Sequence, residues 1–149
     1  MKIHGHWKIT LVGNVMVRTT FGSFNLEGTQ ACYRDQKKKA PVGTPWASLN
    51  NGLYWDMSTL DSLRSFPEMR EWAFKNGCVC VAVVLSDQLR QQIHKMQTGH
   101  LPEDVLRYFS TIKDACEWLT SRGFEISPFD YPHDDFIEHM KKLQQNSAA

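Results

Sequence analysis

Cysteine is scarce in this chain, and the four cysteines lack the spacing of a metal or redox site. Cys32, Cys78, Cys80 and Cys116 form no CxxC pair and no paired-knuckle pattern, which excludes the common zinc and dithiol motifs. Cys78 and Cys80 lie inside an apolar run, where a free cysteine behaves as a small hydrophobic residue. We therefore expect reduced thiols and a cytoplasmic protein.

Long hydrophobic runs and an excess of one charge are also missing. No apolar run approaches the roughly 20 residues needed to cross a bilayer, and the first residues lack the apolar stretch of a secretory signal. The net charge of +1 creates no field that would attract nucleic acid or an anionic membrane. The basic run 37–39 follows a predicted helix, where lysines suit the negative end of the dipole. We expect no membrane span and no nucleic-acid partner.

Motifs for nucleotide binding, catalysis and metal binding are absent as well. The sequence contains no Walker loop, no GxGxxG and no GxSxG elbow. His4 and His6 would share one face of a strand, but no third ligand adjoins them, so we predict no metal site. Cys32 could serve as a nucleophile with a distant histidine, although its helical position favours a core role. We expect no cofactor, and a binding module is favoured over an enzyme.

The residues that are present have the composition of one globular domain. The chain has 149 residues, of which 42% are hydrophobic and 22% charged. Strand patterns at 2–12 and 15–20 are joined by a Gly-Asn turn, which predicts an antiparallel hairpin. A helix is expected over 25–39. The next strand, 46–55, is interrupted by Asn50-Asn51-Gly52, which indicates either a bulge or a small hairpin.

The second half of the chain alternates helices and strands. Ser65-Phe66-Pro67-Glu68 has the form of a capping box and predicts a helix that ends at Gly77. Cys78–Leu85 is apolar at every position, which is typical of a strand buried on both faces. Ser86 is expected to cap the following helix. Its apolar stripe would be Leu89, Ile93 and Met96, with His94 facing solvent.

The last elements end in a tail of different composition. A short strand is predicted over 105–109. A second capping box begins at Thr111 and opens a helix that ends at Gly123. An amphipathic helix follows from about 133 to 144, with a stripe of Phe136, Met140 and Leu143. We expect one shared core that contains Trp72, Val81, Val83 and Leu119.

This order predicts an α/β fold. We expect a mixed, mostly parallel sheet of four or five strands with an antiparallel opening hairpin, in the order β-β-α-β-α-β-α-β-α plus a C-terminal helix. Residues 1–124 would form the domain, and 125–149 would be a C-terminal extension.

Three segments in this order also resemble a known family. They are the aromatic strand end Leu53-Tyr54-Trp55-Asp56, the buried run Val79–Leu85, and the segment Phe109–Leu119 with its terminal Trp-Leu. Over residues 2–122 the chain resembles the STAS class of anti-sigma factor antagonists, represented by stage II sporulation protein AA. It is more similar to bacterial STAS-like proteins of unknown role.

The resemblance directs attention to the segment after Trp55. In the antagonists the second helix opens with Asp-Ser-Ser-Gly, and a serine there accepts phosphate from a kinase partner. Here Asp61-Ser62 is followed by Leu63-Arg64, without the second serine or the glycine. Three interpretations of this segment stay open: helix capping by Ser58, Thr59, Asp61 and Ser62, a surface for a ligand or partner at Asp56, Ser58, Asp61 and Ser62, and a phosphate switch at Ser58 or Ser62.

Three functional hypotheses follow. The first is a non-catalytic cytoplasmic regulatory or ligand-binding module of STAS-like type, with a protein partner or a small anionic or apolar ligand. The second is a small-molecule-binding or weakly catalytic domain that uses the edge around Asp56–Ser62, because ligands of open α/β sheets collect at the carboxyl ends of the strands. The third is a homodimer formed through the tail helix.

Overall fold

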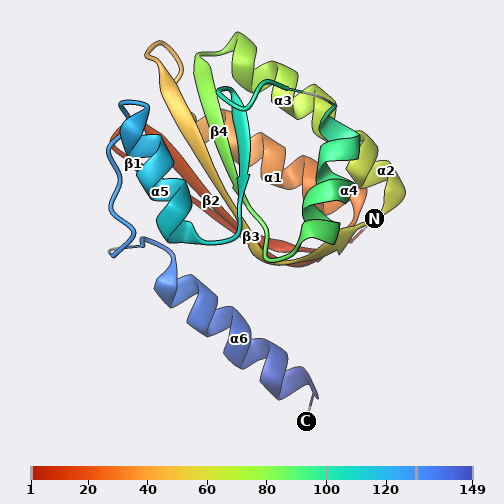
Figure 1. Ribbon diagram of the computed structural model, residues 1–149. Helices are drawn as coiled ribbons and strands as arrows, with labels where there is room; N and C mark the ends of the chain where they lie inside the picture. Colours follow the sequence, from red (N-terminus) through yellow and green to blue (C-terminus); the bar gives the residue numbers. More distant parts are fainter. Residues whose placement is uncertain (1, 100, 130, 149) are drawn as a thin grey trace.

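A five-stranded sheet with helices on both faces forms the body of the protein (Figure 1). The structure is a computed structural model that describes residues 2–99, 101–129 and 131–148. The strands follow chain order across the sheet: β1 (His6–Val12), β2 (Val15–Phe24), β3 (Trp46–Ser58), β4 (Cys78–Val84) and β5 (Leu106–Phe109). β1 and β2 are antiparallel, and each later strand is parallel to its neighbour. The predicted fold class is confirmed.

The helices divide between the two faces according to chain order. They are α1 (Leu26–Lys39), α2 (Leu60–Arg64), α3 (Phe66–Lys75), α4 (Gln88–Thr98), α5 (Ile112–Ser121) and α6 (Asp134–Ala148). Because consecutive parallel strands lie side by side, right-handed crossovers place all their connecting helices on one face. α1 to α4 therefore cover one face, and α5, which follows the last strand, covers the other (Figure 1).

The residues before β1 cross the start of α1 instead of extending the strand. The strand begins at His6, and the backbone N–H of His4 donates to Asn25 Oδ1 over 3.0 Å. A side chain at Gly28 would collide with the His4 carbonyl, which explains a glycine inside this helix. The prediction that His4 and His6 share a strand face is wrong, because His4 precedes the strand.

β3 runs unbroken to Ser58, so Asn50-Asn51-Gly52 forms a bulge and no hairpin. Thr19 pairs with Asn51 and Phe21 with Tyr54, which leaves an extra residue on β3. A Cβ at Gly52 would lie 2.6 Å from Leu85 Cδ2. Glycine is therefore required where β3 approaches the end of β4.

Two of the three predicted caps are wrong. Ser65 is itself helical, and its hydroxyl donates to the Ser62 carbonyl over 2.6 Å, because α2 leads directly into α3. A residue caps a helix through its side chain only from an extended conformation. Asp87, one residue after Ser86, caps α4 by accepting from the Arg90 N–H over 2.7 Å. The third cap is confirmed: Thr111 accepts from the Asp114 N–H over 3.1 Å.

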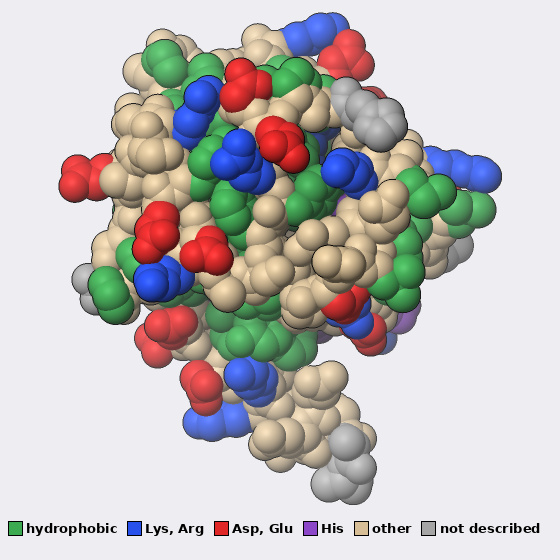
Figure 2. All heavy atoms as spheres, in the orientation of Figure 1, with side chains coloured by type: hydrophobic (Ala, Val, Ile, Leu, Met, Phe, Trp, Pro, Cys, Tyr) green, Lys and Arg blue, Asp and Glu red, His purple; other side chains and the backbone are tan. Residues whose placement is uncertain are grey.

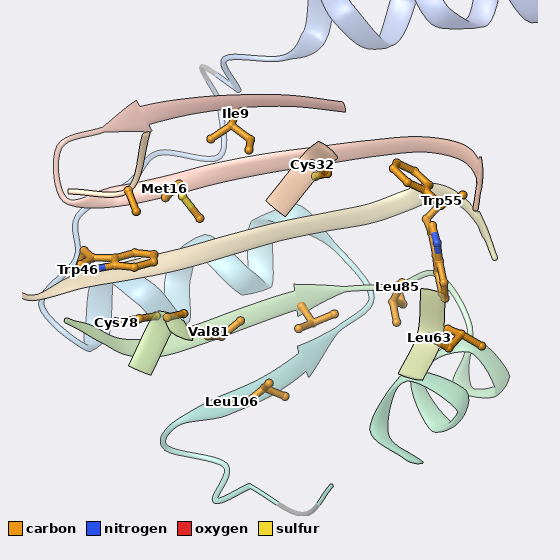
Figure 3. Close-up of a cluster of buried hydrophobic side chains, with 14 residues drawn as sticks. Ile9, Met16, Cys32, Trp46, Trp55, Leu63, Cys78, Val81, Leu85 and Leu106 are labelled. Carbon is orange, nitrogen blue, oxygen red and sulfur yellow. The ribbon is translucent and has the colours of Figure 1, made fainter. Parts of the chain in front are cut away.

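The sheet separates two hydrophobic clusters. Figure 3 shows the cluster under α1 to α4, which includes Val81 and Leu85. Trp72 is partly buried and packs against this cluster. Leu119 belongs to the cluster under α5. Successive residues of a strand point to opposite faces, so Val81 and Val83 face α1 to α4. The prediction of one shared core is wrong for Leu119.

α4 is rotated from the predicted orientation. Of the predicted stripe, Leu89 is 70% exposed, Met96 is 73% exposed and Ile93 is half-buried, whereas His94 is buried. The His94 ring packs 5.4 Å from Phe66 and 5.5 Å from Tyr108, centroid to centroid. The hydrophobic pattern is misleading here because aromatic neighbours and a hydrogen bond bury the histidine.

The tail is anchored to the sheet before α6 extends away from the body (Figure 1). The buried His133 ring lies 2.7 Å from Thr19 Oγ1 through Nδ1 and 2.9 Å from Thr10 Oγ1 through Nε2. Of the predicted stripe on α6, Met140 is buried, and Leu143 is 44% exposed. Ile137, which the prediction omitted, is buried as well.

None of the described helices combines the length and the hydrophobicity that crossing a bilayer requires. On the face drawn in Figure 2, basic and acidic side chains are interspersed. The lysines of 37–39 occupy the last turn of α1, as predicted.

Candidate ligand-binding cavity

The four predicted site residues do not converge on one surface. The Asp56 side chain is 72% exposed and lies 3.6 Å from Arg90 Nη2. Ser62 is fully buried, with its hydroxyl bonded to that of Thr29. Ser58 Oγ accepts from Trp55 Nε1 over 3.0 Å. β3 thus ends with neighbouring residues directed to solvent and to the interior.

Helix capping accounts for little of this segment. Asp61 Oδ1 accepts from the Ser62 N–H over 2.8 Å and from the Thr59 hydroxyl over 2.5 Å. Thr59 occupies the N-cap position of α2 without a side-chain capping bond. Among these residues, only Asp61 serves a backbone N–H of α2. The capping role is therefore wrong for Ser58 and Ser62.

A strained residue separates the two orientations. Met57 has φ of 69°, the one positive φ of a non-glycine residue in the described part of the chain. Such a conformation is unfavourable for a side chain and persists only where the surroundings impose it. Met57 lies between the exposed Asp56 and the inward Ser58, at a second register shift between β2 and β3, where Gly22 pairs with Trp55 and Phe24 with Ser58.

An internal cavity lies behind this segment, between the sheet and helices α1 to α4. It holds about 70 Å³ of space that the centres of water molecules can occupy. Cys32, Trp55, Val81 and Leu85, all labelled in Figure 3, are on its wall. Ser58 also lines it, so one of the four predicted site residues belongs to the cavity.

Strand register brings three chemically different side chains to the cavity floor. Arg18 on β2 pairs with Asn50 on β3, and Asn50 pairs with Val83 on β4. Residues paired across neighbouring strands point to the same face. The floor is therefore polar on the β2 side and apolar on the β4 side.

Two helices supply the roof through the same spacing of i, i+3, i+4 and i+7. These residues face the sheet because that spacing forms one stripe of a helix. From α1 and α3 they are Thr29, Cys32, Tyr33, Gln36, Phe66, Met69, Arg70 and Ala73.

Two arginines dominate the electrostatics of the cavity. Arg18 Nη1 donates to Gln36 Oε1 over 2.7 Å. The Nε atoms of Arg18 and Arg70 are both buried and have no hydrogen-bond partner. None of the described residues that line the cavity is a carboxylate, and the ion pairs found in the same part of the chain involve neither arginine. Burial, followed by the charge of Arg18, lowers the pKa of Arg70.

His94 completes the wall as a neutral group. Its Nδ1 lies 2.7 Å from the Tyr108 hydroxyl. Burial, with Arg70 and Arg18 as further causes, holds the pKa of His94 well below its ordinary value. The imidazole therefore adds hydrogen-bonding capacity without adding a third positive charge.

The other ionisable groups of the wall are inactive as nucleophiles. Burial raises the pKa of Cys32 to about 11 and that of Tyr33 to about 12. A thiol with so high a pKa remains protonated at neutral pH and reacts poorly. In the part of the chain that the structure describes, no cluster of three or more His, Cys, Asp or Glu residues could hold a metal ion. The arrangement is suited to holding an anion.

Sequence reasoning missed Arg18, Arg70 and His94. One signal was available: Arg70 interrupts the apolar stripe of its own helix, one turn after Phe66. Arg18 likewise alternates with buried neighbours in β2. A cation on an inward-facing position is unusual and indicates either a partner or a ligand.

Comparison with known proteins identifies the fold. No protein-family model and no curated protein matches the sequence. The chain is similar to a solved structure, an uncharacterised protein of the DUF3478 family with a SpoIIAA-like fold from Shewanella loihica PV-4. The two are 16% identical with a TM-score of 0.53, and the match covers 80% of this chain and 96% of that one. The predicted resemblance is confirmed as a likeness of fold.

Proposed function

We propose that this protein with a SpoIIAA-like fold is a non-catalytic binding module that holds a small molecule in the cavity under α1 to α4. The observation that carries the proposal is that Arg18 and Arg70 both line one cavity and that none of the described lining residues is a carboxylate. Buried polar groups in proteins are nearly always hydrogen-bonded. A bound molecule would supply the acceptors that the chain does not.

The strand-end edge is less suited to be the primary site. Asp56 already pairs with Arg90, and Asp61 is hydrogen-bonded by Thr59 and the start of α2. Solvated carboxylates with local partners are common on protein surfaces. The edge around Asp56–Ser62 is therefore proposed as a secondary surface.

A regulatory role would arise through Trp55, which connects the cavity to the edge. Its ring lines the cavity and donates to Ser58. Its carbonyl accepts from Arg90 Nη1 over 2.7 Å, and Arg90 pairs with Asp56. A ligand in contact with Trp55 would thus be able to alter how the edge is presented to a protein partner.

The proposed module lies within residues 1–124, since none of the described residues of 125–149 lines the cavity wall. The four cysteines are free and buried, which supports a location in the reducing cytoplasm.

The test is to fill the cavity. Ala73 is buried on the wall, so Ala73→Leu should occupy the space that a ligand needs. Wild-type protein would be titrated with small neutral and anionic compounds while the indole N–H signal of Trp55 is followed by NMR, assigned with Trp55→Phe. We expect saturable binding by wild type and its loss in Ala73→Leu.

The matched control is Asp56→Ala, which removes an exposed carboxylate of the edge and leaves every residue of the cavity wall in place. Binding that survives in Ala73→Leu but disappears in Asp56→Ala would place the site at the edge and contradict the proposal.

A further inference from the structure

We propose that the ligand is a small organic acid whose carboxylate is held by Arg18 and Arg70 and whose apolar body lies among the aromatic residues of the same cavity. This inference rests on the proposed binding function. It adds the charge, the size and the orientation of the ligand.

Charge balance is the first argument. Among the described residues that line the cavity, the half-buried Arg18 and Arg70 meet no carboxylate, and the amide oxygen of Gln36 accepts from Arg18. A charge that is removed from water is normally paired, because it loses hydration without compensation. An anion between the two arginines would reduce their mutual repulsion and accept from their terminal N–H groups.

Hydrogen-bond geometry favours a carboxylate. A guanidinium group presents several N–H donors in a planar fork that matches two carboxylate oxygens. Arg18 comes from β2 and Arg70 from α3, so the two forks approach from the floor and the roof. Because both arginines line the same cavity, the proposal places one carboxylate between them.

The remainder of the wall selects an apolar body over an inorganic ion. Phe24 ends β2, Trp55 lies near the end of β3, and Phe66 opens α3, so these rings gather toward the carboxyl ends of the strands. Leu85 follows β4 at the same end. A phosphate or chloride would leave this half of the cavity unfilled, whereas a hydrocarbon chain would bury apolar surface there.

The volume limits the size of the acid. The centres of water molecules can occupy about 70 Å³ of the cavity. Each water needs about 10 to 15 Å³ of this volume, so the cavity takes roughly five to seven water-sized atoms. Pentanoate, with a carboxylate and a four-carbon chain, is the appropriate probe. Pentanamide has the same shape without the charge.

The experiment compares these two compounds by calorimetry on the full chain, within a series of carboxylates from acetate to octanoate and their amides. We expect pentanoate to bind wild type about 10- to 100-fold more tightly than pentanamide, the effect of hydrogen bonds to a charged group. Arg70→Met should remove this preference, leaving the affinity for pentanamide almost unchanged. Arg70→Lys, which keeps the charge, should restore part of it.

Arg107 supplies the matched control. Its Nε is also buried without a partner, but Arg107 stacks over Trp118 and does not line the cavity. Arg107→Met should bind pentanoate as wild type does.

The outcomes separate the two proposals. If amides bind as tightly as acids and Ala73→Leu blocks both, the cavity binds ligands and the carboxylate inference is wrong. If inorganic phosphate binds in an Arg70-dependent manner and no carboxylate does, the inference is also wrong. If neither the carboxylates nor the amides bind at any chain length, the proposed binding function and the carboxylate inference are both wrong.

Discussion

The two faces of the same sheet differ in the polarity of the side chains that they carry. Under α5 the residues from β2 to β4 are Val15, Val17, Ala47, Leu49, Cys80, Ala82 and Val84, all with exposed fractions of 0%. Under α1 to α4 the same strands present Arg18, Ser48 and Asn50 to a cavity. Alternation along each strand assigns neighbouring residues to opposite faces. The same strands therefore form an apolar face under α5, called the dry face below, and a more polar face that lines the proposed binding cavity.

Hydrogen bonding distinguishes the two faces further. Under α5, the buried Thr19 is bonded to Tyr131 and His133, and both His133 nitrogens have partners. Arg107 on this face has an unbonded Nε, but its side chain is 42% exposed and reaches Glu103 over 4.0 Å. The cavity arginines have no such acid. Two of the three buried Nε atoms without a partner in the described part of the chain thus belong to arginines that line the cavity.

The largest expected effect is on the dry face. Leu119 is fully buried under α5, so Leu119→Ala should lower the free energy of unfolding by about 2–5 kcal/mol, as for other large-to-small core changes. Urea denaturation would measure the loss. Because the cavity lies across the sheet, affinity for a cavity ligand should not change in the folded variant. An unchanged denaturation midpoint would show that α5 does not pack as described.

Acid should destabilise the anchor of the tail. Burial, with Lys8 and Lys39 as further causes, lowers the pKa of His133 to about 4, whereas an unfolded histidine titrates near 6.5. Between these values the unfolded chain takes up the proton first, so stability is lost as pH falls from about 6.5 to 4, by up to roughly 3 kcal/mol. Denaturation at several pH values would test this.

His133→Gln should reduce this dependence on pH. The pH dependence of the free energy of unfolding that remains in this variant would include His94, whose lowered pKa also reduces stability as the pH falls. A pH dependence identical in wild type and His133→Gln would contradict the assignment.

The next prediction has the opposite sign. In ligand-free protein, Arg70→Met should raise the free energy of unfolding by about 1–3 kcal/mol, because it removes a buried Nε–H donor that has no partner among the described residues. Arg107→Met should lower it by about 0.5–1 kcal/mol through lost stacking on Trp118. Thermal unfolding of both variants and of wild type measures the two changes in stability. Destabilisation by Arg70→Met would mean that the buried guanidinium group is satisfied within the chain.

The smallest expected change in stability is at the first residues of two helices, α5 and α3. Thr111 caps α5, so Thr111→Ala should cost about 1 kcal/mol. Ser65 does not cap α3, so Ser65→Ala should cost less. Equal losses in chemical denaturation would indicate that Ser65 contributes a cap in solution.

The accuracy of sequence reasoning followed the same division between faces. The strand Cys78–Leu85, buried except at Val79, and the Thr111 cap were predicted, because each is a local pattern with clear ends. α4 was oriented wrongly, since the burial of His94 depends on Phe66 and Tyr108 from other elements. The Ser65 cap failed because α2 ends where α3 begins.

The sequence by itself determined the order of the elements, the antiparallel hairpin, the buried central strand and the likeness to the SpoIIAA-like fold, because these depend on periodicity and on local turn and cap residues. Only the tertiary structure decided that Arg18 of β2 and Arg70 of α3 line one cavity, while Asp56 and Ser58 point apart. The physical reason is that a shared cavity depends on strand register, crossover handedness and helix packing. Each of these couples residues that are distant along the chain.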